Sequence, residues 1–261
     1  MPKFAANLSF LFTEQPFPLR CAQAAKAGFR GVEFMFPYAY PLEALAGWLA
    51  AADLEMVLFN LPAGDWQSGE RGLACLPGRE AEFRASVELA AQYAKALACR
   101  RLHCLAGLCP AGEDGAVTRA RYVANLRHAA DRLGDSGAQV LIEPINSRID
   151  MPGYWLDHPA KAFELLAEIG RPNVAVQLDC YHAWIISGEV LGWFDRHLDR
   201  IGHVQIADFP GRHEPGSGEI DFPAVFARLD ALGYPGWVGC EYRPLGPTEA
   251  GLGWMQGGDL K

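Results

Sequence analysis

The seven cysteines of the chain show no pairing pattern. They are odd in number, and no two of them have the spacing C-x-x-C. A disulfide framework or a structural zinc site is normally recognised by an even set or by such a spacing. The sequence therefore predicts reduced thiols, most of them buried, at Cys21, Cys75, Cys99, Cys104, Cys109, Cys180 and Cys240.

Positive charge is also scarce. The chain has 23 Lys and Arg residues against 31 Asp and Glu, which gives a formal net charge of −8 at pH 7. No basic stripe could neutralise the phosphates of a nucleic acid or of an anionic membrane surface. We expect neither nucleic acid nor membrane as a partner. A small anionic substrate held by one or two arginines remains compatible with this balance.

Long apolar segments and a dinucleotide motif are absent too. No run approaches the roughly 18 apolar residues of a membrane span. The start, Met1-Pro2-Lys3-Phe4, shows no apolar stretch with a cleavage site. The sequence thus predicts a cytoplasmic protein. The first strand-like segment is not followed by G-x-G-x-x-G, which argues against a dinucleotide-binding sheet.

Strand-like and helix-like segments instead alternate along the chain. The strand-like segments are Phe4–Leu8, Gly31–Phe36, Glu55–Asn60, Arg101–Ala106, Gln139–Asn146, Val174–Asp179, His203–Asp208 and Trp237–Tyr242. The helix-like segments lie near Leu19–Ala27, Leu42–Ala52, Glu80–Leu97, Thr118–Leu133, Pro159–Ile169, Val190–His197 and Pro223–Leu232, with a short one after Thr248. Such alternation predicts parallel strands joined by right-handed helical crossovers.

The length of the chain favours one closed barrel. At 261 residues, 50% of them apolar, the chain has the usual size of a single (β/α)8 or TIM barrel. No linker or low-complexity segment divides it, so residues 1–261 are expected to form one TIM-barrel domain. A doubly wound open sheet is the alternative that segment counting alone leaves open.

Four oxygen-bearing side chains end the last four strand-like segments. They are, in chain order, Glu143, Asp179, Gln205 and Glu241. Catalytic groups of a (β/α)8 barrel come from the carboxyl ends of its strands, so these side chains should meet in one mouth. A lone acid at a strand end is usually a helix cap or a surface ion pair. That explanation is harder to maintain for four successive strands.

Three carboxylates in one mouth predict a bound cation. They would repel one another and raise at least one pKa unless a positive charge held them. Ligation by oxygen alone suits Mg²⁺ or Mn²⁺ better than Zn²⁺. The sequence therefore predicts a Mg²⁺ or Mn²⁺ site on Glu143, Asp179, Gln205 and Glu241. A metal-free acidic pocket with one raised pKa is the alternative.

Several strings spread over the chain carry a family resemblance. They include Asn7-Leu8-Ser9, Leu61-Pro62-Ala63-Gly64-Asp65-Trp66, Ile142-Glu143-Pro144-Ile145-Asn146, Gln205-Ile206-Ala207-Asp208, Arg212-His213-Glu214-Pro215-Gly216 and Gly239-Cys240-Glu241-Tyr242. With them the chain resembles the bacterial hydroxypyruvate isomerase family over nearly its whole length. That family belongs to the xylose-isomerase-like barrels.

The resemblance implies an activity and a set of roles. The family interconverts hydroxypyruvate and 2-hydroxy-3-oxopropanoate (tartronate semialdehyde), within glyoxylate metabolism, by metal-assisted proton transfer through an enediol. Its two acid–base glutamates map onto Glu143 and Glu241, and its metal positions map onto Glu143, Asp179, Gln205 and Glu241. Positioned general acids and bases typically each contribute about 100- to 10,000-fold to the rate.

Further residues are expected to contact a 2-oxo or hydroxy acid substrate. The resemblance implies that His182 forms a hydrogen bond with a substrate oxygen. A substrate carboxylate favours a bidentate guanidinium, for which Arg148 and Arg212 are the candidates, unless they are ordinary surface arginines. Glu219 would orient Arg212 or a substrate hydroxyl. The stretch Leu61–Gly78 is expected to act as a lid.

Other activities on the same barrel stay open. The nearest is 2-oxo-tetronate isomerase, followed by a polyol dehydratase and a non-catalytic sugar-acid binder. A metal-dependent endonuclease is disfavoured, because it would need a histidine-rich multi-zinc site and a basic face for DNA. A homo-oligomer is compatible with the sequence, which does not specify the oligomeric state.

Overall fold

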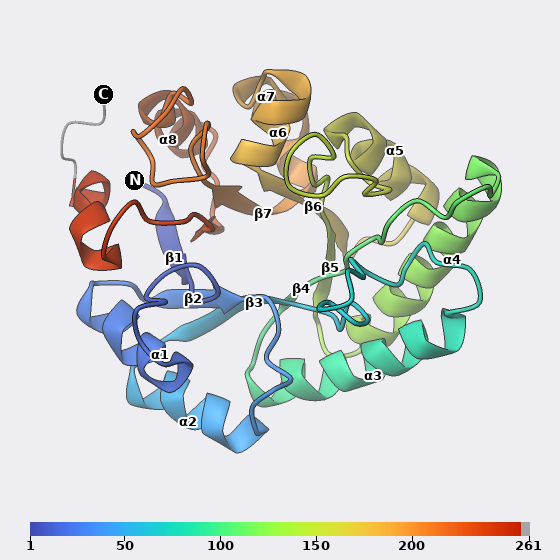
Figure 1. Cartoon of the computed structure of the whole chain (residues 1–261), viewed down its shortest axis with the longest axis horizontal. Helices are drawn as coiled ribbons and strands as arrows, with labels where there is room; N and C mark the ends of the chain where they lie inside the picture. The colour runs from blue at the N-terminus through green and yellow to red at the C-terminus, as the bar shows by residue number, and fades with distance from the viewer. Residues whose placement is uncertain (257–261) are drawn as a thin grey trace.

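Eight parallel strands close into a barrel in chain order, with helices around the outside (Figure 1). This computed structural model describes residues 1–256. The strands are β1 (Lys3–Asn7), β2 (Gly31–Phe34), β3 (Glu55–Asn60), β4 (Arg101–His103), β5 (Gln139–Ile142), β6 (Val174–Asp179), β7 (Ile201–Ile206) and β8 (Trp237–Cys240). The predicted TIM barrel is confirmed, and the open sheet is excluded because β1 pairs with β8.

The helices fill the connections between the strands. They are α1 (Phe17–Lys26), α2 (Leu42–Ala51), α3 (Glu80–Ala96), α4 (Gly115–Gly134), α5 (Pro159–Ile169), α6 (Cys180–Ser187), α7 (Leu191–His197) and α8 (Phe222–Ala231). Short 3₁₀ turns follow at η1 (Leu198–Arg200), η2 (Thr248–Gly251) and η3 (Gly253–Gln256). Within residues 1–256, no helix combines the length and the apolarity that crossing a membrane requires.

The structure departs from the predicted elements at two instructive places. Strand β5 ends at Ile142 rather than at Asn146, because Pro144 has no N–H to donate to the ladder. Helix α6 is not indicated by the sequence pattern, since it follows β6 without a loop. Asp179 caps it directly: its Oδ1 accepts hydrogen bonds from the backbone N–H groups of Tyr181 (2.8 Å) and His182 (3.4 Å).

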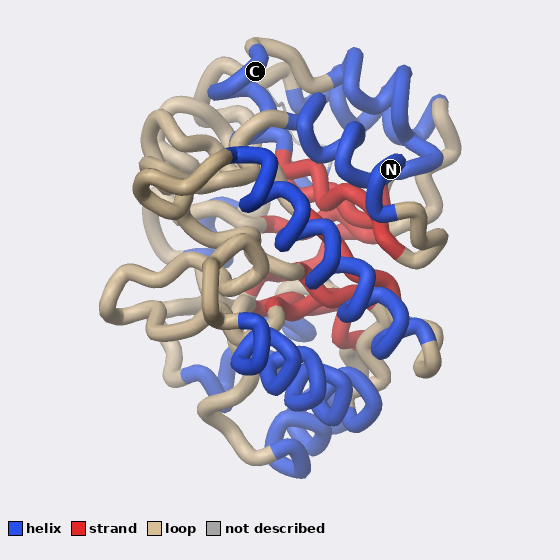
Figure 2. Tube along the Cα trace, turned by 90° about the vertical axis from the view of Figure 1, so that its right-hand side faces the viewer, coloured by secondary structure: helices blue, strands red, loops and turns tan. Residues whose placement is uncertain are grey.

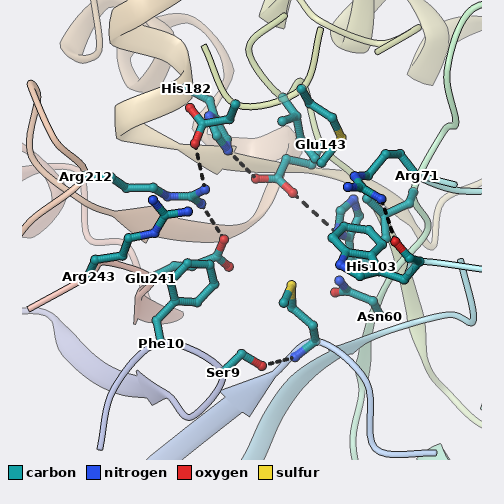
Figure 3. A pocket seen from close by; sticks show the side chains of 16 residues that line it. Ser9, Phe10, Asn60, Arg71, His103, Glu143, His182, Arg212, Glu241 and Arg243 are labelled. Carbon is teal, nitrogen blue, oxygen red and sulfur yellow. Dashed lines mark hydrogen bonds and ion pairs between the residues drawn. The ribbon is translucent and has the colours of Figure 1, made fainter. Parts of the chain in front are cut away.

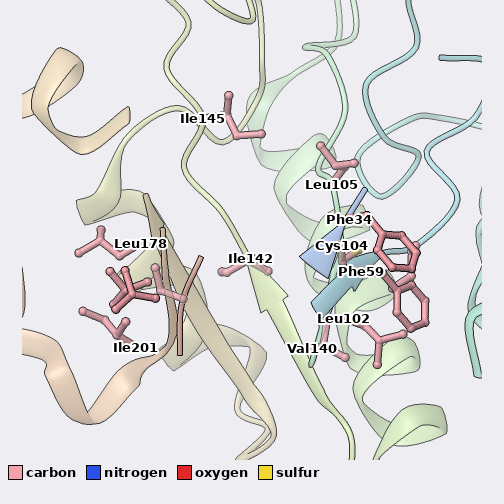
Figure 4. Close-up of a cluster of buried hydrophobic side chains, with 14 of the residues drawn as sticks. Phe34, Phe59, Leu102, Cys104, Leu105, Val140, Ile142, Ile145, Leu178 and Ile201 are labelled. Atoms are coloured by element: carbon pink, nitrogen blue, oxygen red, sulfur yellow. The ribbon is translucent and has the colours of Figure 1, made fainter. Parts of the chain in front are cut away.

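The apolar side chains form a layer outside the barrel and a small plug inside it. Outward-facing residues such as Val140, Ile142 and Leu178 pack among the strands and helices (Figure 4). Inside the barrel, the plug consists of Ala5, Val57, Leu58, Leu141 and Ala175. Because side chains alternate along each strand, the interior positions beyond this plug are free to carry polar groups.

The long loops gather at one end of the barrel (Figure 2). The connections 61–79, 104–114, 143–158 and 207–221 follow β3, β4, β5 and β7. Since all strands are parallel, these loops surround the carboxyl ends of the strands. This is the end at which TIM barrels place their binding sites.

A fully buried carboxylate, that of Glu33, lies inside the barrel beneath this end. Its Oε1 accepts hydrogen bonds from Asn7 Nδ2 at 3.0 Å and from Gln205 Nε2 at 2.7 Å. Its Oε2 lies 2.7 Å from His203 Nε2. Room for the carboxylate comes from Gly239 of β8, where a Cβ atom would lie 2.3 Å from Glu33 Oε2.

We predict that Gly239→Ala destabilises the protein. The added methyl group would displace a buried carboxylate from its donors, and overpacking of this kind costs about 1–3 kcal/mol. Thermal or urea unfolding would measure the loss. Gly47→Ala is a matched control, because Gly47 lies within α2 and its Cβ would meet open space. The control should unfold at or above the wild-type midpoint; equal behaviour of both variants would contradict the steric argument.

Candidate active site

A cavity of about 370 Å³ opens at the carboxyl end of the barrel (Figure 3). Its polar wall consists of Ser9, Asn60, Arg71, His103, Glu143, Asp150, His182, Arg212, Glu241 and Arg243. Its apolar wall consists of Phe10, Met35, Trp66, Leu105, Ile145 and Met151. A cavity of this size suits a small polar molecule, because ligand pockets generally span about 300–1,000 Å³.

The four predicted strand-end residues come together, at two depths. Glu143 and Glu241 lie one residue past β5 and β8 and line the cavity. Asp179 and Gln205 are buried and paired in register between neighbouring strands. Neither of them is among the residues that line the cavity.

Glu241 is the most heavily hydrogen-bonded of these acids. Its Oε2 accepts from Asn7 Nδ2 at 2.9 Å and from Gln205 Nε2 at 2.7 Å. Its Oε1 accepts from Arg212 Nη2 at 2.5 Å. Burial raises the pKa of Glu241 to about 8, although the positive charge of Arg212 opposes the rise. This carboxyl can therefore hold or release a proton near neutral pH.

Arg212 supplies the positive charge inside this acid cluster. Besides Glu241, its side-chain nitrogens lie 3.3 Å from Asp150 Oδ1 and 3.5 Å from Asp179 Oδ2. Burial lowers the pKa of the guanidinium, but the surrounding carboxylates raise it above its ordinary value overall. Arg212 is therefore charged, and its charge faces three protein carboxylates.

The loop that carries Arg212 is built around one buried acid, Asp208. The Oδ1 of Asp208 accepts hydrogen bonds from the backbone N–H groups of Phe209 and Ile220, and its Oδ2 accepts from those of Gly216 and Gly218. Arg212 adopts φ 61° in this loop, a left-handed conformation that costs a non-glycine residue energy. The Asp208 contacts hold that conformation in place.

Glu143 lies between two buried histidines. Its Oε2 is 3.4 Å from His103 Nδ1, and its Oε1 is 3.9 Å from His182 Nε2. Burial raises the pKa of Glu143 well above its ordinary value, and the charges of Glu241 and Asp179 raise it further. Burial lowers the pKa of His103 to about 3 and that of His182 well below its ordinary value. Both imidazoles are therefore neutral.

The neighbours of His182 fix which of its nitrogens carries the proton. Asn146 accepts through Oδ1 from the backbone N–H groups of Ile149 and Asp150. Its amide nitrogen must therefore face the other way, where it donates to His182 Nδ1 at 2.7 Å and to Asp150 Oδ2 at 2.7 Å. Since Nδ1 accepts, neutral His182 carries its proton on Nε2. That N–H group is a donor at the cavity.

Two carboxylate oxygens of the site are left without a donor. Among residues 1–256, Glu143 Oε1 and Asp179 Oδ2 are buried and have no hydrogen-bond partner. They form a compact group with a ring nitrogen of His182, in which the three atoms lie within 4.8 Å of one another. A hard divalent cation would satisfy both oxygens. The protonated Nε2 of His182 is unsuited to ligation, so the donor set is oxygen-based.

Gln205 is oriented differently from a simple ligand. Its Oε1 accepts a hydrogen bond from Gln177 Nε2 at 2.6 Å, whereas its Nε2 faces Glu33 and Glu241. The fit to a divalent cation in this structure consequently depends on the carboxylates of Glu143, Asp179 and Glu241.

The structure does not bring every sequence-predicted residue to the cavity. Arg148 is exposed and donates to the backbone carbonyl of Ile185. Glu219 is exposed on the loop after β7. Neither lines the cavity. Conversely, His103 and Arg71 do line it. Strand-end position could have identified His103, which is the last residue of β4, but no local signal indicates Arg71.

Comparison with known proteins gives close matches over the full chain. The 2-oxo-tetronate isomerase of Cupriavidus necator is 50% identical over 256 residues, covering 98% of both chains. The hydroxypyruvate isomerase of Escherichia coli is 49% identical over 255 residues, again covering 98% of both. A crystal structure from Brucella melitensis, described as an AP endonuclease of family 2, is 48% identical with a TM-score of 0.96 and covers 99% of both chains.

The family assignment follows from these matches together with the barrel. The family described as xylose isomerase-like TIM barrel matches residues 21–257. The chain therefore belongs to the xylose isomerase-like TIM barrel family.

Proposed function

We propose that this protein is a hydroxypyruvate isomerase, which interconverts hydroxypyruvate and 2-hydroxy-3-oxopropanoate. The observation that carries the proposal is the placement of two carboxylates, buried Glu143 and partly buried Glu241, on one cavity from strands separated by β6 and β7. The raised pKa of each suits a group that accepts and returns a proton. The relative of that name at 49% identity supports the substrate.

The proposed reaction needs no oxidant or reductant. One glutamate takes a proton from C3, the C–H electron pair forms the C2=C3 bond, and the carbonyl pair moves onto O2. The C3 hydroxyl proton then passes to O2 as the C3=O bond forms. The C2=C3 pair takes a proton at C2 from the other glutamate. Substrate and product have the same atoms.

We assign the two acid–base positions to Glu143 and Glu241. Because β5 and β8 lie on different parts of the ring, the two carboxyls can address neighbouring carbons of one small substrate. His182 would donate its Nε2–H to a substrate oxygen. Arg212 would hold Glu241 in place and partly neutralise it, since three carboxylates already surround its guanidinium.

We propose that Mg²⁺ or Mn²⁺ is held by the carboxylates of Glu143, Asp179 and Glu241, and by Gln205 Oε1 once the Gln205 amide turns away from Gln177. Such a cation would stabilise the negative charge that develops on two adjacent substrate oxygens. The unpartnered oxygens of Glu143 and Asp179 support this assignment.

A second candidate substrate is 2-oxo-tetronate, which has one more carbon. The relative from Cupriavidus necator, 50% identical, carries that isomerase name. The cavity volume of about 370 Å³ accommodates three- and four-carbon acids alike. Rates on both substrates, measured side by side, would separate the two activities.

Endonuclease activity has less support, although one similar crystal structure bears that name. The net charge of −8 disfavours a DNA-binding face. The cluster that could bind a metal contains one histidine, His182, whose tautomer makes it a donor.

We expect Glu143→Gln and Glu241→Gln each to lower kcat on hydroxypyruvate by about 100- to 10,000-fold, because an amide cannot relay a proton. Product would be measured by coupling to tartronate semialdehyde reductase. Exchange of the C3 protons in deuterated water would report the first step separately. Glu164→Gln is the control, since Glu164 is an exposed glutamate of α5.

Turnover near the wild-type value in either active-site variant would overturn the acid–base assignment. Loss of activity in Glu164→Gln as well would show that the effect is not specific to the cavity. A wild-type enzyme that turns over neither acid, with Mg²⁺, Mn²⁺ or chelator present, would overturn the proposed function.

We also expect Mn²⁺ to raise the melting temperature of chelator-treated protein. At about 100 times its dissociation constant, a ligand adds about 2.7 kcal/mol, or roughly 5–10 °C for a domain of this size. Asp179→Asn should abolish the shift while its amide oxygen still caps α6. Asp221→Asn is the matched control, because Asp221 caps α8 through Ala224 N, away from the cavity.

The metal-induced shift should also depend on pH. Burial raises the pKa of Asp179 to about 6, and protons compete with the metal for the same oxygens. Burial also raises the pKa of Glu241, another proposed ligand, to about 8. The shift should therefore be full only well above pH 8 and should decline as the pH falls through 8 and then through 6. A shift that persists in Asp179→Asn would contradict the proposed metal site.

A further inference from the structure

The cavity contains more positive charge than the acid–base chemistry uses. Three arginines line it, namely Arg71, Arg212 and Arg243. If the proposed function holds, the substrate is a 2-oxo acid, whose carboxylate needs a cationic partner. Guanidinium groups pair with carboxylates through parallel N–H donors, so each of the three can be judged by its remaining bonding capacity.

The two terminal nitrogens of Arg212 are already engaged by acids, and within residues 1–256 only its Nε has no hydrogen-bond partner. Arg212 is buried, and its guanidinium lies within 3.5 Å of oxygens of Glu241, Asp150 and Asp179. A substrate carboxylate at this position would face two carboxylates that line the same cavity, those of Glu241 and Asp150. Arg212 therefore compensates protein charge.

Arg71 is a fixed cation without an acidic partner. Its guanidinium stacks on Trp66, with Cζ 4.2 Å from the ring centroid. Its Nη1 donates to the backbone carbonyls of Trp66 at 3.0 Å and Glu70 at 2.8 Å. Within the described part of the chain, no carboxylate forms an ion pair with it, and its Nε and Nη2 have no hydrogen-bond partner.

The neighbouring acid, Glu70, is turned away from Arg71. Its Oε1 accepts from Arg79 Nη1 at 2.5 Å, and its Oε2 accepts from the backbone N–H of Asp65 at 2.6 Å. The charge of Arg71 is thus left uncompensated by its own loop. An unpaired, half-buried guanidinium at a cavity wall is suited to an anionic ligand.

The backbone next to Arg71 is held in place by the barrel. Gly72 has φ 121° and forms an isolated bridge with Ala106. A Cβ atom at Gly72 would lie 2.3 Å from the carbonyl oxygen of Leu105. Gly72 N also donates to Ala63 O at 3.0 Å. This part of the predicted lid, Leu61–Gly78, is therefore anchored, and Arg71 is pre-positioned.

The three arginines stand on two sides of the cavity (Figure 3). Arg71 lies on one side, beside Asn60 and His103, whereas Arg212 and Arg243 lie on the other side. Glu143 lies between these two sides. Arg243 is exposed, and its side chain makes no hydrogen bond with any residue of the described range 1–256. It lacks the stacking and the anchored backbone that fix Arg71.

From this arrangement we propose that Arg71 binds the carboxylate of the 2-oxo acid substrate. The guanidinium, held flat on Trp66, receives the acid end of the molecule. The two carbons that exchange a proton then extend from that end toward Glu143 and Glu241. The inference rests on the proposed function, which it deepens by assigning the carboxylate position.

Steady-state kinetics on hydroxypyruvate would test the assignment. A charge-assisted pair of this kind corresponds to about 10- to 100-fold in affinity, so Arg71→Met should raise KM by that factor while kcat falls less than about tenfold. Arg71→Lys keeps the charge but loses the planar fork, and its KM should lie in between. Arg243→Met is the matched comparison, with KM expected within about threefold of wild type.

Binding of glycerate, a three-carbon carboxylate that the proposed reaction cannot convert, would be measured by calorimetry on the same proteins. Its dissociation constant should rise about 10- to 100-fold in Arg71→Met and stay near wild type in Arg243→Met. Wild-type KM and glycerate affinity in both Arg71 variants would overturn the assignment. A large effect confined to Arg243→Met would overturn it as well.

These outcomes are distinct from failure of the proposed function. A wild-type enzyme that binds glycerate through Arg71 but does not isomerise hydroxypyruvate would leave the carboxylate site standing and reject the reaction. If the wild-type enzyme isomerises hydroxypyruvate and Arg71→Met leaves KM unchanged, the reaction stands and the carboxylate site at Arg71 is rejected.

Discussion

The arrangement of this protein depends on how it accommodates carboxylates buried inside a closed barrel. An ionised group removed from water must be paired or hydrogen-bonded. Glu33 meets three side-chain donors, and Glu241 meets Arg212 and two amides. Asp179 has its Oδ1 engaged by the first turn of α6. What remains unsatisfied is one oxygen each of Glu143 and Asp179. The hydrogen bonds of Glu33 are complete, and the residual bonding capacity lies on Glu143 and Asp179, two of the acids for which the chemistry is proposed.

A continuous set of contacts joins the two sides of the acid cluster. It runs from Glu241 through Arg212 and Asp150 to Asn146 and then to His182. Each member fixes the state of the next: the guanidinium stays charged beside three acids, and the oriented amide leaves the imidazole proton on Nε2. Because the members come from the loops after β5 and β7, from helix α6 and from the residue after β8, the protonation state of the site depends on how these segments pack together.

The cavity is consequently polarised. One side presents acids with their countercharge, and the other presents Arg71 on its aromatic support (Figure 3). Both sides are held by fixed contacts: the Asp208 carboxylate organises the loop of Arg212 through backbone N–H groups, and Gly72, the residue after Arg71, anchors the backbone beside it. A small molecule with a carboxylate at one end and a reacting carbonyl at the other matches this distribution of charge.

The sequence by itself determined the alternation of strands and helices and the acids at the strand ends, and it favoured a barrel, whereas the closure of the sheet was decided by the pairing of β1 with β8. Strand and helix periodicity is local, and in a parallel barrel every strand end lies at the same mouth, so Glu143 and Glu241 could be placed without coordinates. The directions of loop side chains were decided only by tertiary structure. Arg148 and Arg212 look equivalent as loop arginines, yet Arg148 is exposed and bonds the backbone carbonyl of Ile185, whereas Arg212 is buried among acids. That difference arises because Asp208 gathers amides up to 12 residues away, a long-range contact that no local pattern encodes.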